Sequence, residues 1–215
     1  MNQKTSKRTH SNKSNYHHGD LRSALINEAT QILKESGVEG LSLRKLADKA
    51  GVSRTAPYHH FKDKNQLLCT IAEQGFERWQ SDAELIFNRD DITAQQKYRV
   101  FFHGYIQYAA DNPELYDLMF GRTIWKQNSA TQALKDVAFP SFQHQVEMTK
   151  KWQRQGIMPS NENTLRLSQV TWGTMHGIAR LLIDGIYADR THIDEMCDCA
   201  VNLFTRQLSI SDEVD

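Results

Sequence analysis

Residues 20–65 contain three stretches with the helical spacing of apolar residues, and the second and third of them are very short. Ser42 predicts the N-cap of the second stretch, and Gly51 ends it because glycine readily adopts the positive φ of a tight turn. Ser53 predicts another N-cap two residues later, for a helix over residues 54–61. Two short helices joined by a glycine turn have the size and punctuation of a helix-turn-helix unit, which leaves few other folds for this segment.

The first of the three stretches supplies the surface against which the two short helices pack. Its apolar residues recur at helical spacing over residues 21–33, and Gly37 then predicts its C-terminal end. Leu46 and Ala47 lie on one face of the second helix, and the small Ala47 allows a close approach to the first. The sequence therefore predicts a small three-helix unit.

The charges of the chain are unevenly distributed, although 26 basic and 26 acidic side chains give a formal net charge of zero. Residues 1–65 hold 12 Lys/Arg and 6 Asp/Glu, whereas residues 66–215 hold 14 and 20. A basic head on an acidic body is typical of a nucleic-acid-binding unit joined to a regulatory one, and ordinary charge scatter is the other interpretation. Residues 1–18 contain no acid and predict a basic flexible arm, either inert or in contact with DNA phosphates.

The predicted helix over residues 54–61 carries many large polar side chains for so short an element. In a helix that enters the major groove, N-terminal side chains reach base edges and flanking donors hold phosphates. Arg54 suits the paired acceptors of guanine, and the methyl group of Thr55 suits that of thymine. A plain solvated helix is the alternative interpretation. The donors that suit phosphate oxygens are Tyr58, His59, Lys62 and Lys64.

The segment GLSLRKLADKAGVSRTAPYHHFKDKNQLL, at residues 40–68, resembles the DNA-binding head of the TetR family of bacterial regulators. The resemblance extends from about residue 19 and implies that the positions matching Arg54 and Thr55 face bases. It also implies that the position matching Arg44 touches a base or a phosphate, and that later positions hold phosphates. The DNA-binding residues that we predict are Arg44, Lys45, Arg54, Thr55, Tyr58, His59, Lys62 and Lys64.

Helical spacing continues through the second half, and no run shows the period-two alternation of a strand. Asp63 predicts the N-cap of a helix that ends near residue 88, with Gln66 at the spacing of a capping box. Further helices are predicted over residues 93–110, 113–120, 129–155, 163–183 and 193–208. The sequence thus predicts an all-α chain, with a three-helix helix-turn-helix DNA-binding domain at residues 19–65 and a helical ligand-binding and dimerisation domain at residues 66–215.

The last two predicted helices are apolar on two faces. In the helix over residues 163–183, one apolar line passes through Val170 and another through Trp172 and Met175. Helices with two apolar faces are buried on two sides. We therefore expect a homodimer through the last two helices, and a two-fold dimer predicts a palindromic site on double-stranded DNA.

The sequence WGTMHG at residues 172–177 resembles the Trp-His-Gly signature of a C-terminal domain found in some TetR regulators. Aromatic side chains with a few polar groups among them suit an amphipathic or aromatic small molecule. Simple core packing is the alternative interpretation, in which His103 and His176 only satisfy buried hydrogen bonds. The effector-pocket residues that we predict are Phe102, His103, Tyr105, Met119, Phe120, Trp125, Trp172, Met175 and His176.

Several other classes of protein are excluded by the sequence. Cys197 and Cys199 lie two residues apart, so on a helix they point about 200° away from each other, and no metal site is predicted. No nucleophile, phosphate-loop or dinucleotide motif is present, so we expect neither an enzyme nor a cofactor. Three cysteines, no N-terminal apolar region and no stretch of about 18 apolar residues predict a cytoplasmic protein without membrane contact.

Together these patterns predict a sequence-specific transcriptional regulator, a repressor that a small-molecule effector releases from a palindromic operator. Repression rather than activation follows only from the family resemblance. Two alternatives stay open at this point. One is a TetR-like protein that organises the chromosome through a protein partner, and the other is an enzyme whose helical body is attached to a DNA-binding head.

Overall fold

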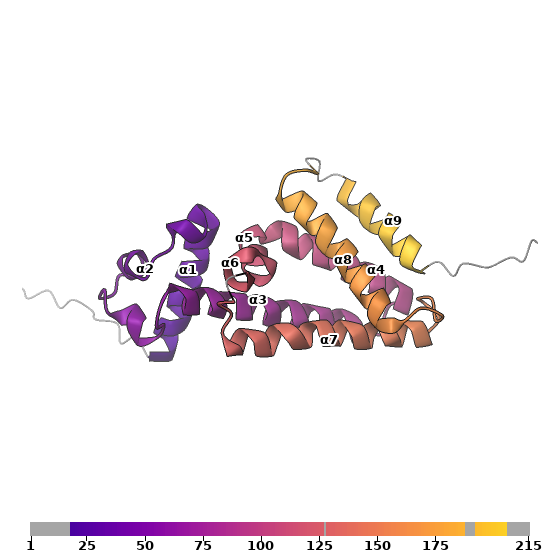
Figure 1. Cartoon of the computed structure of the whole chain (residues 1–215), viewed down its shortest axis with the longest axis horizontal. Helices are drawn as coiled ribbons and strands as arrows, with labels where there is room; N and C mark the ends of the chain where they lie inside the picture. Colours follow the sequence, from indigo (N-terminus) through magenta and orange to yellow (C-terminus); the bar gives the residue numbers. More distant parts are fainter. Residues whose placement is uncertain (1–17, 127, 188–191, 206–215) are drawn as a thin grey trace, which may run out of the picture.

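Helices form the regular structure of the chain, and the predicted all-α class is confirmed. The computed structural model describes residues 18–126, 128–187 and 192–205, and within these ranges there is no strand. The predicted arm at residues 1–18 lies outside them except for its last residue. The helices are α1 His18–Gly40, α2 Leu43–Lys49, η1 Ala56–His59, α3 Lys64–Phe87, α4 Ala94–Asp111, α5 Pro113–Phe120, α6 Arg122–Trp125, α7 Gln132–Arg154, α8 Thr164–Ile183 and α9 Ile193–Thr205 (Figure 1).

The elements α1, α2 and η1 form a head at one end of an elongated molecule, and α8 and α9 lie at the other end (Figure 1). Gly37 has φ 63° and interrupts α1, as the sequence predicted. The side chain of Ser42 caps α2 by accepting a hydrogen bond from the amide of Lys45 at 3.1 Å. Gly51 has φ 67° and makes the turn after α2. These local signals therefore act where the sequence places them.

The predicted helix over residues 54–61 is wrong in type, because the structure has only the 3₁₀ turn Ala56–His59 there. Pro57 has no N–H to donate to a carbonyl four residues earlier. The first amide of the turn instead donates to the carbonyl of Ser53, three residues back, at 2.9 Å. The hydroxyl of Ser53 lies 3.2 Å from that of Thr55 and does not cap a helix. The segment that the sequence predicted to contact DNA is thus the short 3₁₀ turn Ala56–His59, called the recognition turn below.

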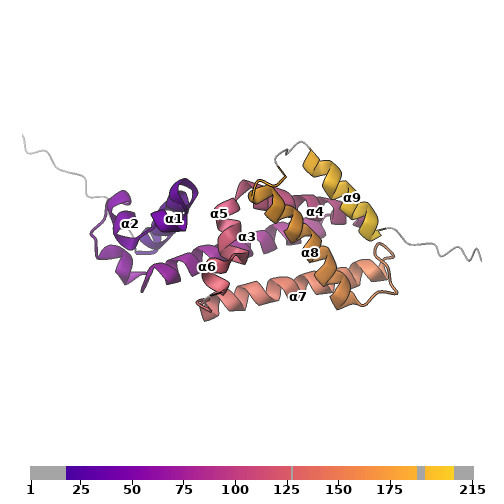
Figure 2. The same cartoon turned by 45° about the horizontal axis from the view of Figure 1, so that its top comes forward.

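The helix α3 leaves the head and runs along the body (Figures 1 and 2). Its N-cap is Asp63, which accepts from the amide of Gln66 at 2.8 Å, as predicted. The side chain of Gln66 accepts from the amide of Lys62 rather than from that of Asp63, so the reciprocal bond of a capping box is displaced by one residue. One continuous helix therefore joins the recognition turn to the body.

The body is a bundle of helices in which α3 packs against α4, α5 and α7, and α4 packs against α8 and α9. Two apolar cores lie along it. The first joins α1, α2 and the start of α3 to α5 and α6, and the second surrounds α4. Trp79 and Phe120 contact both cores, so the head and the body share apolar side chains. No helix among the described residues has the length and apolar character needed to cross a bilayer.

Two details near the centre of the chain differ from the prediction. The one-turn helix α6 was not predicted, and α7 begins after an N-cap at Thr131 rather than at residue 129. Ser129 instead donates its hydroxyl to the carbonyl of Ile124 at 3.0 Å and closes α6. Ser129 therefore caps the C-terminal end of α6 and not the start of α7. The sequence pattern alone does not distinguish these two roles.

Candidate nucleic-acid interface and internal cavity

The outer surface of the head carries all eight side chains that the sequence assigned to DNA. Seven of them are exposed, and Lys64, in the first turn of α3, is half-buried. Tyr58 is 57% exposed, which is high for an aromatic side chain. Nε of Arg54 lies 3.7 Å from Oδ1 of Asp48, an exposed ion pair that contributes little to stability. Contact between these residues and DNA stays a prediction.

Phe61 fixes the recognition turn to the rest of the head. Its side chain is 1% exposed and belongs to the core formed by α1, α2 and α3. The guanidinium carbon of Arg22 lies 5.4 Å from the centre of its ring, within reach of a cation–π interaction. The ring therefore holds the turn and the start of α3 in one position.

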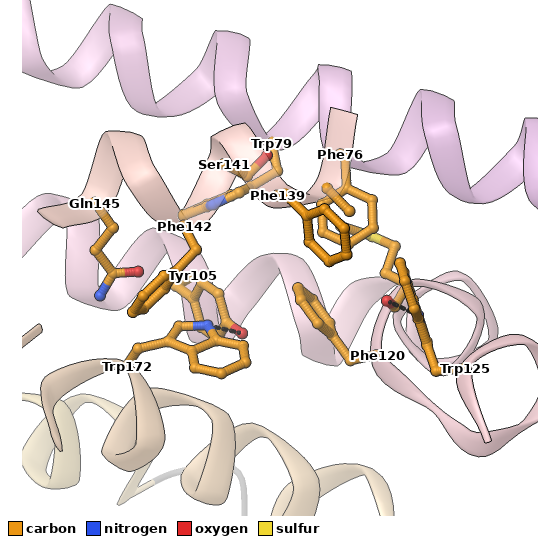
Figure 3. A pocket seen from close by; sticks show the side chains of 12 residues that line it. Phe76, Trp79, Tyr105, Phe120, Trp125, Phe139, Ser141, Phe142, Gln145 and Trp172 are labelled. Atoms are coloured by element: carbon orange, nitrogen blue, oxygen red, sulfur yellow. Dashed lines mark hydrogen bonds between the residues drawn. The ribbon is translucent and has the colours of Figure 1, made fainter. Parts of the chain in front are cut away.

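A cavity of about 300 Å³, partly open to solvent, lies in the body and is bordered by α3, α4, α5, α6, α7 and α8 (Figure 3). Eight of the twelve lining side chains are aromatic, and none is charged. The volume is at the lower end of the range for small-molecule sites. The lining residues are Phe76, Trp79, Tyr105, Met119, Phe120, Trp125, Ala138, Phe139, Ser141, Phe142, Gln145 and Trp172.

Five of the predicted pocket residues lie on the wall of this cavity, namely Tyr105, Met119, Phe120, Trp125 and Trp172. Two others, Phe102 and Met175, are fully buried in the core around α4 and do not line it, which corrects their assignment. Binding of an effector by the five wall residues stays a prediction.

His103 is also not on the cavity wall. Its Nδ1 lies 3.1 Å from Oδ1 of Asp194 and its Nε2 lies 2.9 Å from Oδ1 of Asp198, so the imidazole joins α4 to α9. Arg99 pairs with the same Asp198 from one turn earlier in α4. The predicted role of His103 at the pocket is therefore replaced by a polar connection between two helices.

His176 lies behind the wall, at the end of a chain of hydrogen bonds. Nε1 of Trp172 donates to the hydroxyl of Tyr105 at 3.2 Å, and this hydroxyl lies 2.9 Å from that of Tyr116. The hydroxyl of Tyr116 lies 2.6 Å from Nδ1 of His176. The indole N–H can only donate, so the hydroxyl of Tyr105 accepts from it, and either hydroxyl can donate in the Tyr105–Tyr116 pair. In the tautomer that carries its proton on Nε2, Nδ1 of His176 accepts from the hydroxyl of Tyr116. His176 therefore supports the wall residues without lining the cavity.

The protonation state of His176 fits this chain. Burial lowers the pKa of His176 below its ordinary value, and the positive charge of Arg180 lowers it further. Burial also raises the pKa of Tyr116, so its hydroxyl keeps its proton. Both effects keep the imidazole of His176 neutral and the hydroxyl of Tyr116 protonated at neutral pH, so this hydroxyl can donate to Nδ1.

The pH dependence of stability tests this assignment. The pKa of His176 is lower in the folded chain than its value of about 6.5 in the unfolded one, so the unfolded state takes up the proton first as the pH falls. We expect this contribution to the free energy of unfolding to be complete above about pH 6.5 and to be lost below it. In His176→Asn an amide oxygen replaces Nδ1 and does not titrate. Urea unfolding at pH 7.5 and 5.5 should show a smaller loss for this variant, and equal losses would contradict the assignment.

Sequence reasoning missed the contribution of α7 and of the middle of α3 to the cavity. Phe76 and Trp79 come from α3, and Phe139, Phe142 and Gln145 come from α7. The signal in the sequence was the pair Phe139 and Phe142, which lie three residues apart and flank Pro140 inside the helix.

Metal ligation is not suggested by the side chains that the structure describes. Within these ranges no three His, Cys, Asp or Glu residues are grouped to hold an ion. Cys69 and Cys197 are buried and Cys199 is exposed, and all three are free thiols.

Comparison with known proteins identifies the family. Residues 25–69 match the model of the bacterial regulatory proteins of the tetR family, and residues 99–204 match that of the tetracyclin repressor-like C-terminal domain. The chain belongs to the TetR family. A solved structure of a protein with unknown function from Rhodococcus sp. RHA1 is 30% identical with a TM-score of 0.77, over 90% of this chain and 100% of that one.

Other TetR relatives are similar over the head alone or in fold alone. The tetracycline repressor protein class C of Escherichia coli is 46% identical over 52 residues, which are 24% of each chain. The match thus spans about a quarter of this curated relative. The TetR-family regulator PfmR from Thermus thermophilus has a TM-score of 0.62 and 20% identity, over 86% of this chain and 98% of that one.

Both matched models describe the TetR family, and the curated relatives that match the head include transcriptional repressors, so these similarities support DNA-binding transcription regulation. Homodimers and responses to small molecules are typical of this family.

Proposed function

We propose that this TetR-family regulator is a homodimeric repressor that leaves a palindromic operator in the cytoplasm when a small molecule fills the body cavity. The observation that carries this proposal is the course of α3. Its first turn follows the recognition turn, and Phe76 and Trp79 from its middle line the cavity. With a rise of 1.5 Å per residue, about 18 Å of rigid helix separates Lys64 from Phe76.

A second contact supports coupling between the cavity and the head. A Cβ atom placed on Gly75 would lie 2.7 Å from Sδ of Met119, so α3 and α5 approach closely there. Met119 belongs to the head core and also lines the cavity. The hydroxyl of Tyr108 donates to the carbonyl of Gly75 at 3.0 Å and holds the same crossing. A ligand that displaced Met119 would shift α3 relative to α5. Its affinity would then differ between the two conformations of the protein, which is the condition for an allosteric effect.

Exposed apolar side chains on α8 and α9 support a dimer through these helices, which both pack on α4 at the end of the molecule away from the head (Figures 1 and 2). Val170 is 58% exposed and Leu203 is 64% exposed. A Cβ atom on Gly173 or Gly177 would have no atom within 4 Å, so this face of α8 is open to a closely approaching helix. A two-fold dimer would present two heads to an inverted repeat.

Selection of genomic fragments by the purified protein, at about 0.15 M salt, tests the proposed mode of DNA binding. We expect a few enriched sites that share an inverted repeat. Recovery of hundreds of sites would instead favour the chromosome-organising alternative, and recovery of none would contradict an effector-released repressor.

Arg54→Ala is expected to relax base preference at one position in each half-site. The loss of a bidentate pair with a base amounts to about 1–3 kcal/mol of discrimination. The measurement is the affinity for the selected operator and for its single-base variants at that position. An unchanged preferred base would exclude Arg54 from base recognition.

Lys64→Ala is expected to weaken binding to all DNA sequences alike. Removal of one phosphate contact should reduce the slope of log affinity against log salt by about 1. Fluorescence anisotropy with operator and with unrelated DNA, over a range of salt concentrations, measures both effects. A slope equal to that of the unchanged protein would show that Lys64 makes no phosphate contact.

A further inference from the structure

The polar groups around the cavity are few, and most are already bonded within the protein. Nε1 of Trp125 donates to the carbonyl of Met119 at 2.7 Å, and the hydroxyl of Ser141 donates to that of Val137 at 3.0 Å. The hydroxyl of Tyr105 has two partners, in Trp172 and Tyr116. These atoms hold the wall together and are not free donors for a ligand.

Two polar groups on the wall have no partner among the described residues. They are the side-chain amide of Gln145 and the indole N–H of Trp79. Gln145 lies at one end of the cavity, and Trp125 lies at the opposite end beside Phe120 (Figure 3). The cavity therefore has one end with hydrogen-bonding capacity and one end that is apolar.

The charge of the cavity wall limits the charge of a ligand. None of the twelve lining residues is Asp, Glu, Lys, Arg or His. An ion that left water for this space would meet no opposite charge, and its desolvation would cost more than an amide could restore. Aromatic faces attract a desolvated cation by about 2 kcal/mol, which is less than the cost of burying an unpaired ammonium group.

The shape of the wall favours flat rings. The ring of Trp172 lies 5.9 Å from that of Phe120 and 5.9 Å from that of Phe142, and both pairs are tilted by about 60°. Such splayed rings leave faces and edges for stacked or edge-on contact with a further ring. An apolar cavity of about 150 Å³ holds one benzene, so about 300 Å³ accommodates two fused rings.

We infer that the cavity takes an uncharged two-ring aromatic molecule with one hydrogen-bonding group, held by the amide of Gln145. The rings lie between the aromatic walls and the polar group points toward α7. This inference rests on the proposed function for its regulatory meaning, but not for the binding itself.

Calorimetry on the full-length protein at neutral pH tests the ligand class with four probes. They are neutral 2-naphthol, anionic 2-naphthoate, cationic 2-naphthylmethylammonium and the neutral aliphatic 1-decanol. We expect 2-naphthol to bind at least about tenfold more tightly than each of the other three. Equal or tighter binding of any other probe, or no binding of 2-naphthol, would overturn the inference.

Variants of Gln145 test the hydrogen-bonding end. Gln145→Leu is expected to weaken 2-naphthol about fivefold, and Gln145→Glu to transfer the preference to the ammonium probe. Gln143→Leu is the matched control, because Gln143 is exposed on the same helix and does not line the cavity. Equal affinities for 2-naphthol in the unchanged protein and in Gln145→Leu would remove Gln145 from the site.

Operator binding measured with the same probes separates this inference from the proposed function. If 2-naphthol binds as expected but leaves the affinity for DNA unchanged, the ligand class stands and release by an effector is wrong. If a charged probe binds more tightly and releases the operator, the proposed function stands and the ligand class is wrong.

Discussion

Replacing Phe61 by alanine is expected to lower the free energy of unfolding by about 3–5 kcal/mol. The ring is almost fully buried in the core of the head, and its removal leaves a cavity under the recognition turn. The turn consists of a single four-residue 3₁₀ helix, so its position depends on the packing of Phe61. Urea unfolding at a fixed protein concentration measures the effect, because the stability of a dimer depends on concentration.

Tyr58→Ala is the matched control for the Phe61 variant. Tyr58 belongs to the same turn but is exposed, so the free energy of unfolding should change by less than about 0.5 kcal/mol while DNA binding weakens. The Phe61 variant should lose both stability and DNA binding. A loss of stability below about 1 kcal/mol for Phe61→Ala would contradict its role as anchor.

The second large effect is expected for Tyr116→Phe, at about 2–4 kcal/mol. The change removes one oxygen, which leaves Nδ1 of His176 without its partner and the hydroxyl of Tyr105 with Trp172 alone. Urea unfolding near pH 7.5, where the imidazole is neutral, measures the loss.

Tyr98→Phe provides a control of the same chemistry in the same core. Tyr98 is as buried as Tyr116, but its hydroxyl has no hydrogen-bond partner among the described residues. Removal of an unpaired buried hydroxyl should be neutral or stabilising. If both variants lost equal stability, the hydrogen-bond chain through Tyr116 would have no special role.

Much of the fold was predictable because its signals are local. Ser42 and Asp63 cap helices through their own side chains, and Gly37 and Gly51 have the positive φ that their positions require. The recognition turn was less predictable. Pro57 stands where proline is tolerated in the first turn of an α-helix. The backbone hydrogen bonds of this segment nevertheless span three residues, except for the bond from Phe61 to Pro57, which spans four.

The cavity was only partly predictable, because its position depends on how helices distant in sequence meet. Phe120 of α5 and Trp172 of α8, which the sequence singled out, lie on its wall, whereas the aromatic residues of α7 were not foreseen. Phe102 and Tyr105 lie one turn apart on α4, yet only Tyr105 borders the empty space. Which aromatic side chain fills a core and which one borders a space is decided by the volumes of its neighbours, and sequence spacing does not contain that information.

The contribution of α7 to the cavity has a consequence for how such a regulator can diversify. Beyond its first turns, this helix packs on α3 and α8, and it carries none of the side chains assigned to DNA. If the cavity binds an effector as proposed, substitutions at Phe139, Phe142 or Gln145 change which molecule is sensed and leave the residues assigned to DNA untouched. In that case α7 is the place to redesign ligand specificity without altering DNA specificity.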